Sequence, residues 1–200
     1  MNGFEESSLI VAAGDLWSQA TRAAFLDAIA EGQLPEEAFR RWLAQDYLFA
    51  KGLTSFQAVA AAKTPRGSQS LLIQGLVAMD HEMDWFEANA TEMRIDLSVE
   101  PHRICRRYVD YLIAAAYAQP FEVLLAILFG VEVSYLVAWS RLKPEGPYVQ
   151  FIERWSNQHF VEYVQGLRDL AEIHPHSNQQ QHFNEVLRHE RDFWGMTWEG

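Results

Sequence analysis

The sequence contains only one cysteine, Cys105, among its 200 residues. A single thiol cannot form an intramolecular disulfide or a cluster of thiolate metal ligands, and this usage fits a reducing compartment. The N-terminal segment has neither the basic start nor the long apolar stretch of an export signal. We therefore predict a cytoplasmic protein in which Cys105 is a small buried side chain rather than a nucleophile.

Long apolar runs and positive charge are also scarce. No uninterrupted apolar run reaches the roughly 18 residues that span a bilayer, so a membrane partner is not expected. The chain has 16 Lys and Arg residues against 27 Asp and Glu residues, and its formal net charge is −11. Because such a surface repels phosphate backbones and anionic head groups, nucleic acid is not expected as a partner either.

Hydrophobic residues make up 49% of the chain and aromatic residues 13%, which is typical of a globular protein rich in large rings. The length predicts one domain over residues 1–200. Apolar residues recur at spacings of three and four, and the alternation of a strand never persists. We therefore predict an all-α bundle of about seven antiparallel helices. The predicted breaks between the helices are 32–35, 64–67, 97–101, 119–120, 143–147 and 174–178.

Three of the predicted helices carry an acidic residue on their apolar face. Asp46 falls on the stripe that runs from residue 39 to 53, Glu132 on the stripe from 125 to 139, and Glu190 on the stripe from 183 to 194. Moving an ionised carboxylate out of water costs several kcal/mol, so stability alone does not favour three such acids. Their repetition indicates a functional site, although any one of them alone is also compatible with a structural role at the edge of a stripe.

If the bundle brings these faces together, the result is an acidic pocket with aromatic walls. The predicted wall residues are Phe49, Tyr135, Trp155, Phe193 and Trp194. Aromatic rings supply stacking area for a flat, nitrogen-rich ring, and a carboxylate accepts paired N–H bonds from an aminopyrimidine. Crowded acids raise one another's pKa, which leaves one of them protonated as a general acid. Glu82 is a further candidate, with a solvated helix face as the alternative.

Four segments resemble those of a known family. "EGQLPEEAFRRWLAQDYLF" contains Asp46, and "HERDFWGM" contains Glu190. Between them stand "PFEVLLAILFGVEVSYLVAW" and "YVQFIERWSNQHFVEYV". In order and pattern they resemble the signatures of the TenA (thiaminase II) family, and the resemblance covers nearly the whole chain.

The resemblance implies a heme oxygenase-like helical bundle that binds aminopyrimidines from thiamin breakdown and requires no cofactor or metal. Carried over to this sequence, it implies that Asp46 holds the pyrimidine amino group and ring nitrogen, and that Glu190 handles the proton of the leaving group. Tyr135 and Trp155 become pocket wall, and Phe49 stands where many members have tyrosine. Relatives of this kind assemble as dimers or tetramers, so a homo-oligomer is expected.

The sequence departs from the family pattern at one catalytic position. Many members carry a nucleophilic cysteine in "PC...Y", where this chain has Gly130 or Val131. A second branch lacks that cysteine and shows an "E..Y" arrangement, which Glu132 and Tyr135 resemble. The expected reaction is hydrolysis of an aminomethylpyrimidine, or of its formyl derivative, to hydroxymethylpyrimidine. Glu132 and Glu190 share the acid and water-orienting roles in an order that the sequence leaves open, as it leaves open whether thiamin is cleaved.

Two other classes of function remain as alternatives. The first is a di-iron enzyme, because His182, Glu185 and His189 are spaced by three and four, with Glu82 and Glu132 as further oxygen ligands. The second is a pyrimidine-binding or regulatory protein without activity, which follows from the missing cysteine. Ammonia release from candidate pyrimidines separates an enzyme from a binding protein.

Overall fold

The computed structural model describes residues 3–199, and every regular element among them is a helix. The all-α prediction is therefore confirmed. The elements are the short 3-10 helix η1 (Phe4–Glu6), α1 (Ser8–Ala13), α2 (Asp15–Thr21), α3 (Ala24–Ala30), α4 (Glu36–Lys63), α5 (Gln69–Glu92), α6 (Arg103–Ala118), α7 (Phe121–Ser140), α8 (Val149–Trp155), α9 (Gln158–Ile173) and α10 (Gln179–Glu199).

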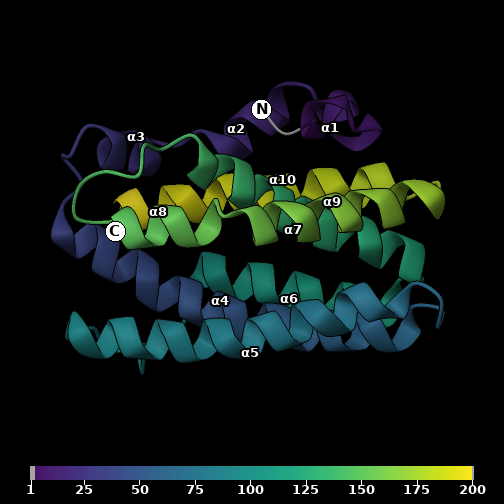
Figure 1. Ribbon diagram of the computed structural model, residues 1–200, viewed down its shortest axis with the longest axis horizontal. Helices are drawn as coiled ribbons and strands as arrows, with labels where there is room; N and C mark the ends of the chain where they lie inside the picture. Colours follow the sequence, from purple (N-terminus) through teal and green to yellow (C-terminus); the bar gives the residue numbers. More distant parts are fainter. Residues whose placement is uncertain (1–2, 200) are drawn as a thin grey trace.

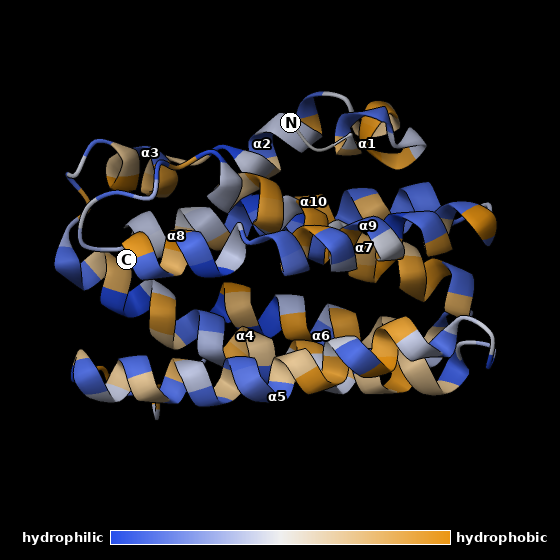
Figure 2. Ribbon diagram, in the orientation of Figure 1, coloured by the Kyte–Doolittle hydropathy of each residue, from blue (hydrophilic) through white to orange (hydrophobic). Residues whose placement is uncertain are grey.

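The long helices pack in two layers (Figure 1). α4 packs against α5 and α6 in one layer, and α7 packs against α9 and α10 in the other. The short helices α1 to α3 cover α10 on the far side of the second layer. Hydrophobic and hydrophilic residues alternate along most helices in Figure 2, as expected of helices with one buried and one exposed side.

All six predicted breaks fall between helices, because proline, glycine and capping residues end a helix locally. The structure has more helices than the predicted seven or so. The segment before Gly32 divides into η1 and three short helices, with Gly14 at φ 57° between two of them. α9 starts separately from α8 because Asn157 caps it, its side-chain oxygen accepting from Phe160 N at 2.9 Å.

α7 is the central helix of the fold, and its composition would also suit a membrane-spanning segment. By length and composition alone, Phe121–Ser140 is apolar enough to cross a membrane, with a mean hydropathy of 2.0. However, 78% of its most apolar window is buried inside the structure. A helix that is hydrophobic nearly all round is also what the core of a larger domain requires. α7 therefore carries Glu132 and Tyr135 through the middle of the bundle.

α4 and α6 approach each other closely at Gly52. A Cβ atom at this position would lie 2.6 Å from Cγ1 and 2.7 Å from Cγ2 of Val109. Real Cβ atoms do not approach other carbon atoms so closely, because interiors are packed to van der Waals contact. Gly52 therefore sets the distance between α4, which carries Asp46, and α6, which carries Tyr108.

Candidate active site

A cavity of about 470 Å³ lies among α4, α5, α7, α8 and α9. Its volume is in the range that holds a small organic ligand. Most of its wall is apolar, and the larger apolar side chains are Phe49, Leu53, Phe86, Val131, Trp155 and Phe160. The acidic residues that face the cavity are Asp46, Glu82 and Glu132.

Asp46 is 5% exposed and lies on the buried side of α4. The Tyr135 hydroxyl donates to Asp46 Oδ2 at 2.8 Å, so α7 fixes the orientation of the carboxyl. Burial raises the pKa of Asp46 to about 7, the hydrogen bond from Tyr135 lowers it, and the charge of Glu82 raises it. Asp46 therefore exchanges its proton close to neutral pH while one face stays open to the cavity.

Glu132 lies near the middle of α7 and is 8% exposed. Among residues 3–199, no side chain or backbone group forms a hydrogen bond with its carboxyl, which lines the cavity instead. Burial raises the pKa of Glu132 to about 8, and the charge of Glu82 adds to the shift. A buried, unpartnered carboxyl that is protonated at neutral pH is suited to donate a proton to a ligand.

Glu190 on α10 is 5% exposed and is held by α6, where the Tyr108 hydroxyl donates to Glu190 Oε1 at 2.6 Å. Burial raises the pKa of Glu190 to about 8, the Tyr108 hydrogen bond lowers it, and the charges of Asp46 and Glu132 raise it. Glu190 is thus coupled to both acids, although it lies behind the residues that line the cavity. Two of the three acids that the sequence singled out, Asp46 and Glu132, thus line the cavity, and the third lies behind its wall.

Glu82 does not lie on a freely solvated helix face. The Trp155 indole Nε1 donates to Glu82 Oε1 at 2.7 Å, and Arg154 Nε donates to Glu82 Oε2 at 2.8 Å. The Arg154 guanidinium lies 5.0 Å from the centre of the Trp85 ring, which supports a cation–π contact. α5 and α8 are therefore joined by an ion pair at the cavity wall.

The predicted aromatic wall is present in part. Phe49, Tyr135 and Trp155 line the cavity, and the rings of Tyr135 and Trp155 meet edge to face at 5.3 Å. Phe193 lies one layer deeper, with its ring centre 5.7 Å from that of Phe49. Trp194 also lies outside the lining, and its Nε1 donates to Ala20 O at 3.1 Å. α10 thus supports the wall rather than forming it.

Sequence reasoning missed Tyr108, Arg154 and Tyr163. Tyr108 is a buried aromatic on the apolar stripe of α6, and such a residue is read as core. Arg154 resembles any exposed cation until its partner Glu82 is known.

Cys105, the single cysteine, lies one turn before Tyr108 and is buried. Its Sγ lies 3.5 Å from Gln45 O, and burial raises the pKa of its thiol to about 12.

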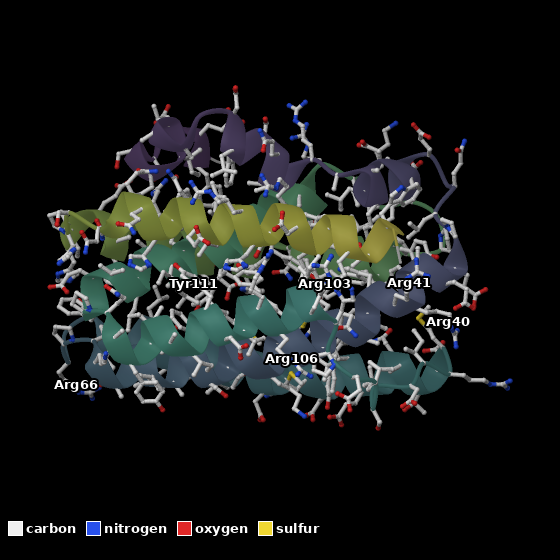
Figure 3. All side chains as sticks on the ribbon, turned by 180° about the vertical axis from the view of Figure 1, so that it is seen from behind. Arg40, Arg41, Arg66, Arg103, Arg106 and Tyr111 are labelled. Atoms are coloured by element: carbon white, nitrogen blue, oxygen red, sulfur yellow. The ribbon has the colours of Figure 1, made fainter. Side chains whose placement is uncertain are left out.

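The iron ligands suggested by the sequence do not assemble. Among the described residues, no group of three His, Cys, Asp or Glu side chains lies close enough together to hold a metal ion. His182 Nδ1 lies 2.9 Å from the hydroxyl of Tyr111, which lies on α6 beside α10 (Figure 3). The His189 ring stacks on Tyr108 at 4.7 Å. Both histidines therefore pack against tyrosines, and burial lowers the pKa of each.

Solved structures of other proteins share this fold. A TenA homologue from Pyrococcus furiosus is 31% identical and superposes with a TM-score of 0.89, covering 96% of this chain and 99% of the other. A structure described as a TenA family transcription regulator, from a Silicibacter species, is 21% identical with a TM-score of 0.90, covering 100% of this chain and 98% of the other. At that identity the likeness shows the fold alone.

Among sequences, a Glycine max protein named "Probable bifunctional TENA-E protein" is 26% identical over 201 residues, which cover 91% of this chain and 88% of the relative. The profile of the TENA/THI-4/PQQC family matches residues 12–200. The buried acids and rings described above all fall within that span. The chain therefore belongs to the TENA/THI-4/PQQC family.

Proposed function

We propose that this protein is a C–N hydrolase of thiamin salvage that converts an aminomethylpyrimidine, or its formyl derivative, to hydroxymethylpyrimidine. One observation carries the proposal. Asp46 and Glu132 face the same ring-walled cavity, and burial raises the pKa of each into the range where a carboxyl exchanges protons at neutral pH. The family membership and the TENA-E name of the Glycine max relative support the same class of chemistry.

The aminopyrimidine ring is expected to lie between the aromatic walls. Asp46, oriented by Tyr135, accepts a hydrogen bond from the exocyclic amino group and, in its protonated form, donates one to the ring nitrogen. Phe49 and Trp155 cover the ring from two sides of the cavity. Because a carboxylic acid and a flat aminopyrimidine pair through two parallel hydrogen bonds, this arrangement fixes the direction in which the leaving amine points.

The reaction replaces the amine of the ligand by a hydroxyl group. The oxygen of a water molecule bonds to the methylene carbon, the carbon–nitrogen bond breaks, and a protonated carboxyl supplies a proton to the departing amine. We assign that proton to Glu132, because its carboxyl faces the cavity without a protein partner. Glu190, held by Tyr108 behind the cavity wall, is assigned the proton that the water loses. It takes up this proton in its ionised form, which the Tyr108 hydrogen bond stabilises and which becomes more populated as pH rises toward about 8.

Glu132→Gln and Glu190→Gln test this assignment. Both variants should lose at least about a hundredfold in ammonia release from aminomethylpyrimidine, since each removes a proton-transfer group. Binding of hydroxymethylpyrimidine should remain measurable by calorimetry. The exposed Glu153 on α8 supplies the control, and Glu153→Gln should turn over normally.

Unchanged turnover in either cavity variant would exclude the role assigned to that glutamate. Tight pyrimidine binding without ammonia release by the unmodified protein would instead support the non-catalytic alternative, a binding or regulatory protein. A cytoplasmic location, the absence of a cofactor and a homo-oligomeric assembly remain predictions that accompany the proposal.

A further inference from the structure

Tyr163 lines the cavity from α9, and its hydroxyl is engaged by a buried amide. Gln57 on α4 is fully buried, and its Nε2 atom lies 3.0 Å from the Tyr163 hydroxyl oxygen. The same Nε2 atom lies 3.0 Å from the backbone carbonyl oxygen of Leu72 on α5. Three helices thus meet at one polar contact inside an otherwise apolar wall.

This contact determines which way the Tyr163 proton points. A backbone carbonyl only accepts hydrogen bonds, so the Gln57 atom that faces Leu72 O has to be the nitrogen. That nitrogen donates to Tyr163 as well, which makes the Tyr163 oxygen an acceptor there. The Tyr163 proton is then directed away from Gln57, and no group among residues 3–199 accepts it. Buried hydroxyl donors almost always find an acceptor.

Gly75 on α5 makes the contact sterically possible. A Cβ atom at this position would lie 2.2 Å from Gln57 Nε2 and 2.4 Å from the Tyr163 hydroxyl oxygen. Any side chain here would therefore push the amide and the phenol apart. Burial and the charge of nearby Glu132 raise the pKa of Tyr163 well above its ordinary value, which keeps the hydroxyl protonated.

We propose that Tyr163 is a specificity-determining residue, whose hydroxyl donates a hydrogen bond to an acceptor atom of the ligand at the Glu132 end of the cavity. Gln57 is the positioning residue that aims this donor. The inference rests on the proposed function for the identity of the ligand, a substituted pyrimidine. The inference adds that the Tyr163 hydroxyl recognises an acceptor oxygen or nitrogen on the ligand substituent near Glu132, in addition to the shape of that substituent.

The test compares two probes by calorimetry. Hydroxymethylpyrimidine carries an acceptor oxygen, and the analogue with a methyl group in its place does not. The unmodified protein should prefer the hydroxymethyl compound, and Tyr163→Phe should reduce that preference by about two- to tenfold, the range for one hydrogen bond. Gln57→Glu should reduce it similarly although Tyr163 is retained, because a carboxyl oxygen accepts the Tyr163 proton and turns it from the cavity.

Tyr47→Phe is the matched control. This variant also loses one tyrosine hydrogen bond, the 2.8 Å contact of the Tyr47 hydroxyl with Glu87. Because Tyr47 lies outside the cavity lining, the preference for the hydroxymethyl compound should not change. Thermal unfolding of each variant reports whether folding is intact. An unchanged preference in a folded Tyr163→Phe variant would overturn the inference.

A crystal structure of the full chain separates this inference from the proposed function. We expect Gln57 Nε2 to be the only protein atom within hydrogen-bond distance of the Tyr163 hydroxyl. If no pyrimidine binds, the proposed function fails. A Tyr163 hydroxyl that contacts only Gln57 Nε2 would still support the inference that its proton is available to a ligand. A protein acceptor for the Tyr163 proton would overturn the inference even if pyrimidines bind.

Discussion

Each of the carboxyls near the cavity is held in a different way, and this difference sets what each can do. Asp46 accepts from Tyr135 and still faces the cavity. Glu190 accepts from Tyr108 behind the wall, and Glu82 is tied to Arg154 and Trp155. Glu132 alone keeps its carboxyl free of protein partners within the described residues, so it is the acid best placed to contact a ligand.

Tyr108→Phe should shift the pH dependence of turnover. The Tyr108 hydrogen bond stabilises the ionised form of Glu190 and lowers its pKa, so removing it raises the pKa of Glu190 further above about 8. The limb of the kcat/KM profile that reports Glu190 should move to higher pH by about one unit. Tyr111→Phe, which removes the contact with His182, serves as the control. A limb that does not move would show that Glu190 does not govern it.

Glu82→Gln should produce the opposite shift. The negative charge of Glu82 raises the pKa of Glu132 and of Asp46, so its removal lowers both. The corresponding limbs of the pH profile should move to lower pH. The direct measurement is the carboxyl chemical shift of Glu132 followed by NMR across the titration. A rise in the pKa of Glu132 in this variant would contradict the proposed coupling.

The residues that sequence reasoning found were those that break a local rule. Asp46, Glu132 and Glu190 interrupt apolar stripes, and a carboxyl on such a stripe is visible without any structure. Tyr108 and Tyr163 obey the rule for buried aromatics and gave no signal. Their roles arise from partners that are distant in sequence, Glu190 and Gln57, and only the packing of helices brings these together.

At the scale of elements, the long helices were predictable because their spacing and their ends are local properties of the chain. The short helices α1, α2, α3 and α8 have six or seven residues each, which is too few to show a periodic pattern. The distance between neighbouring helices was not predictable either. It depends on single small residues such as Gly52 and Gly75, whose neighbours belong to other helices.

Gly52→Ala should separate α4 from α6. The new methyl group would overlap both Cγ atoms of Val109, and overpacking of this kind costs about 1–3 kcal/mol. Urea unfolding should report this loss as a lower midpoint with an unchanged slope. The double variant Gly52→Ala with Val109→Ala should recover part of the loss, because the overlapping atoms are gone. Destabilisation that the second change does not relieve would indicate another cause.

At the scale of the whole molecule, stability should depend on pH through the buried acids. The pKa of Glu132 is raised from 4.5 to about 8 by folding, and that of Asp46 from 3.8 to about 7. A carboxyl whose pKa is raised by folding makes its full contribution to stability below its pKa in the unfolded chain. That contribution is lost as the pH rises through its pKa in the folded protein. The free energy of unfolding should therefore fall between about pH 4, where these groups ionise in the unfolded chain, and about pH 8, where they have ionised in the folded protein.

Glu132→Gln isolates one part of this dependence. The amide cannot ionise, so the variant should be more stable than the unmodified protein near pH 9 and show no such gain near pH 5. For a chain of this length, each kcal/mol regained raises the Tm by roughly 2–4 °C. Calorimetric scans at the two pH values measure the difference. An equal effect at both would mean that Glu132 ionises as it does in the unfolded chain.

The apolarity of α7 has a consequence for the chain before it folds. Before the chain folds, Phe121–Ser140 has the length and mean hydropathy of a membrane-spanning segment. An acid at the centre of such a segment opposes entry into lipid by roughly 2.5–3.5 kcal/mol. Glu132 lies near that central position, so we expect the carboxyl proposed for chemistry also to disfavour insertion of this segment into lipid before its neighbours enclose it.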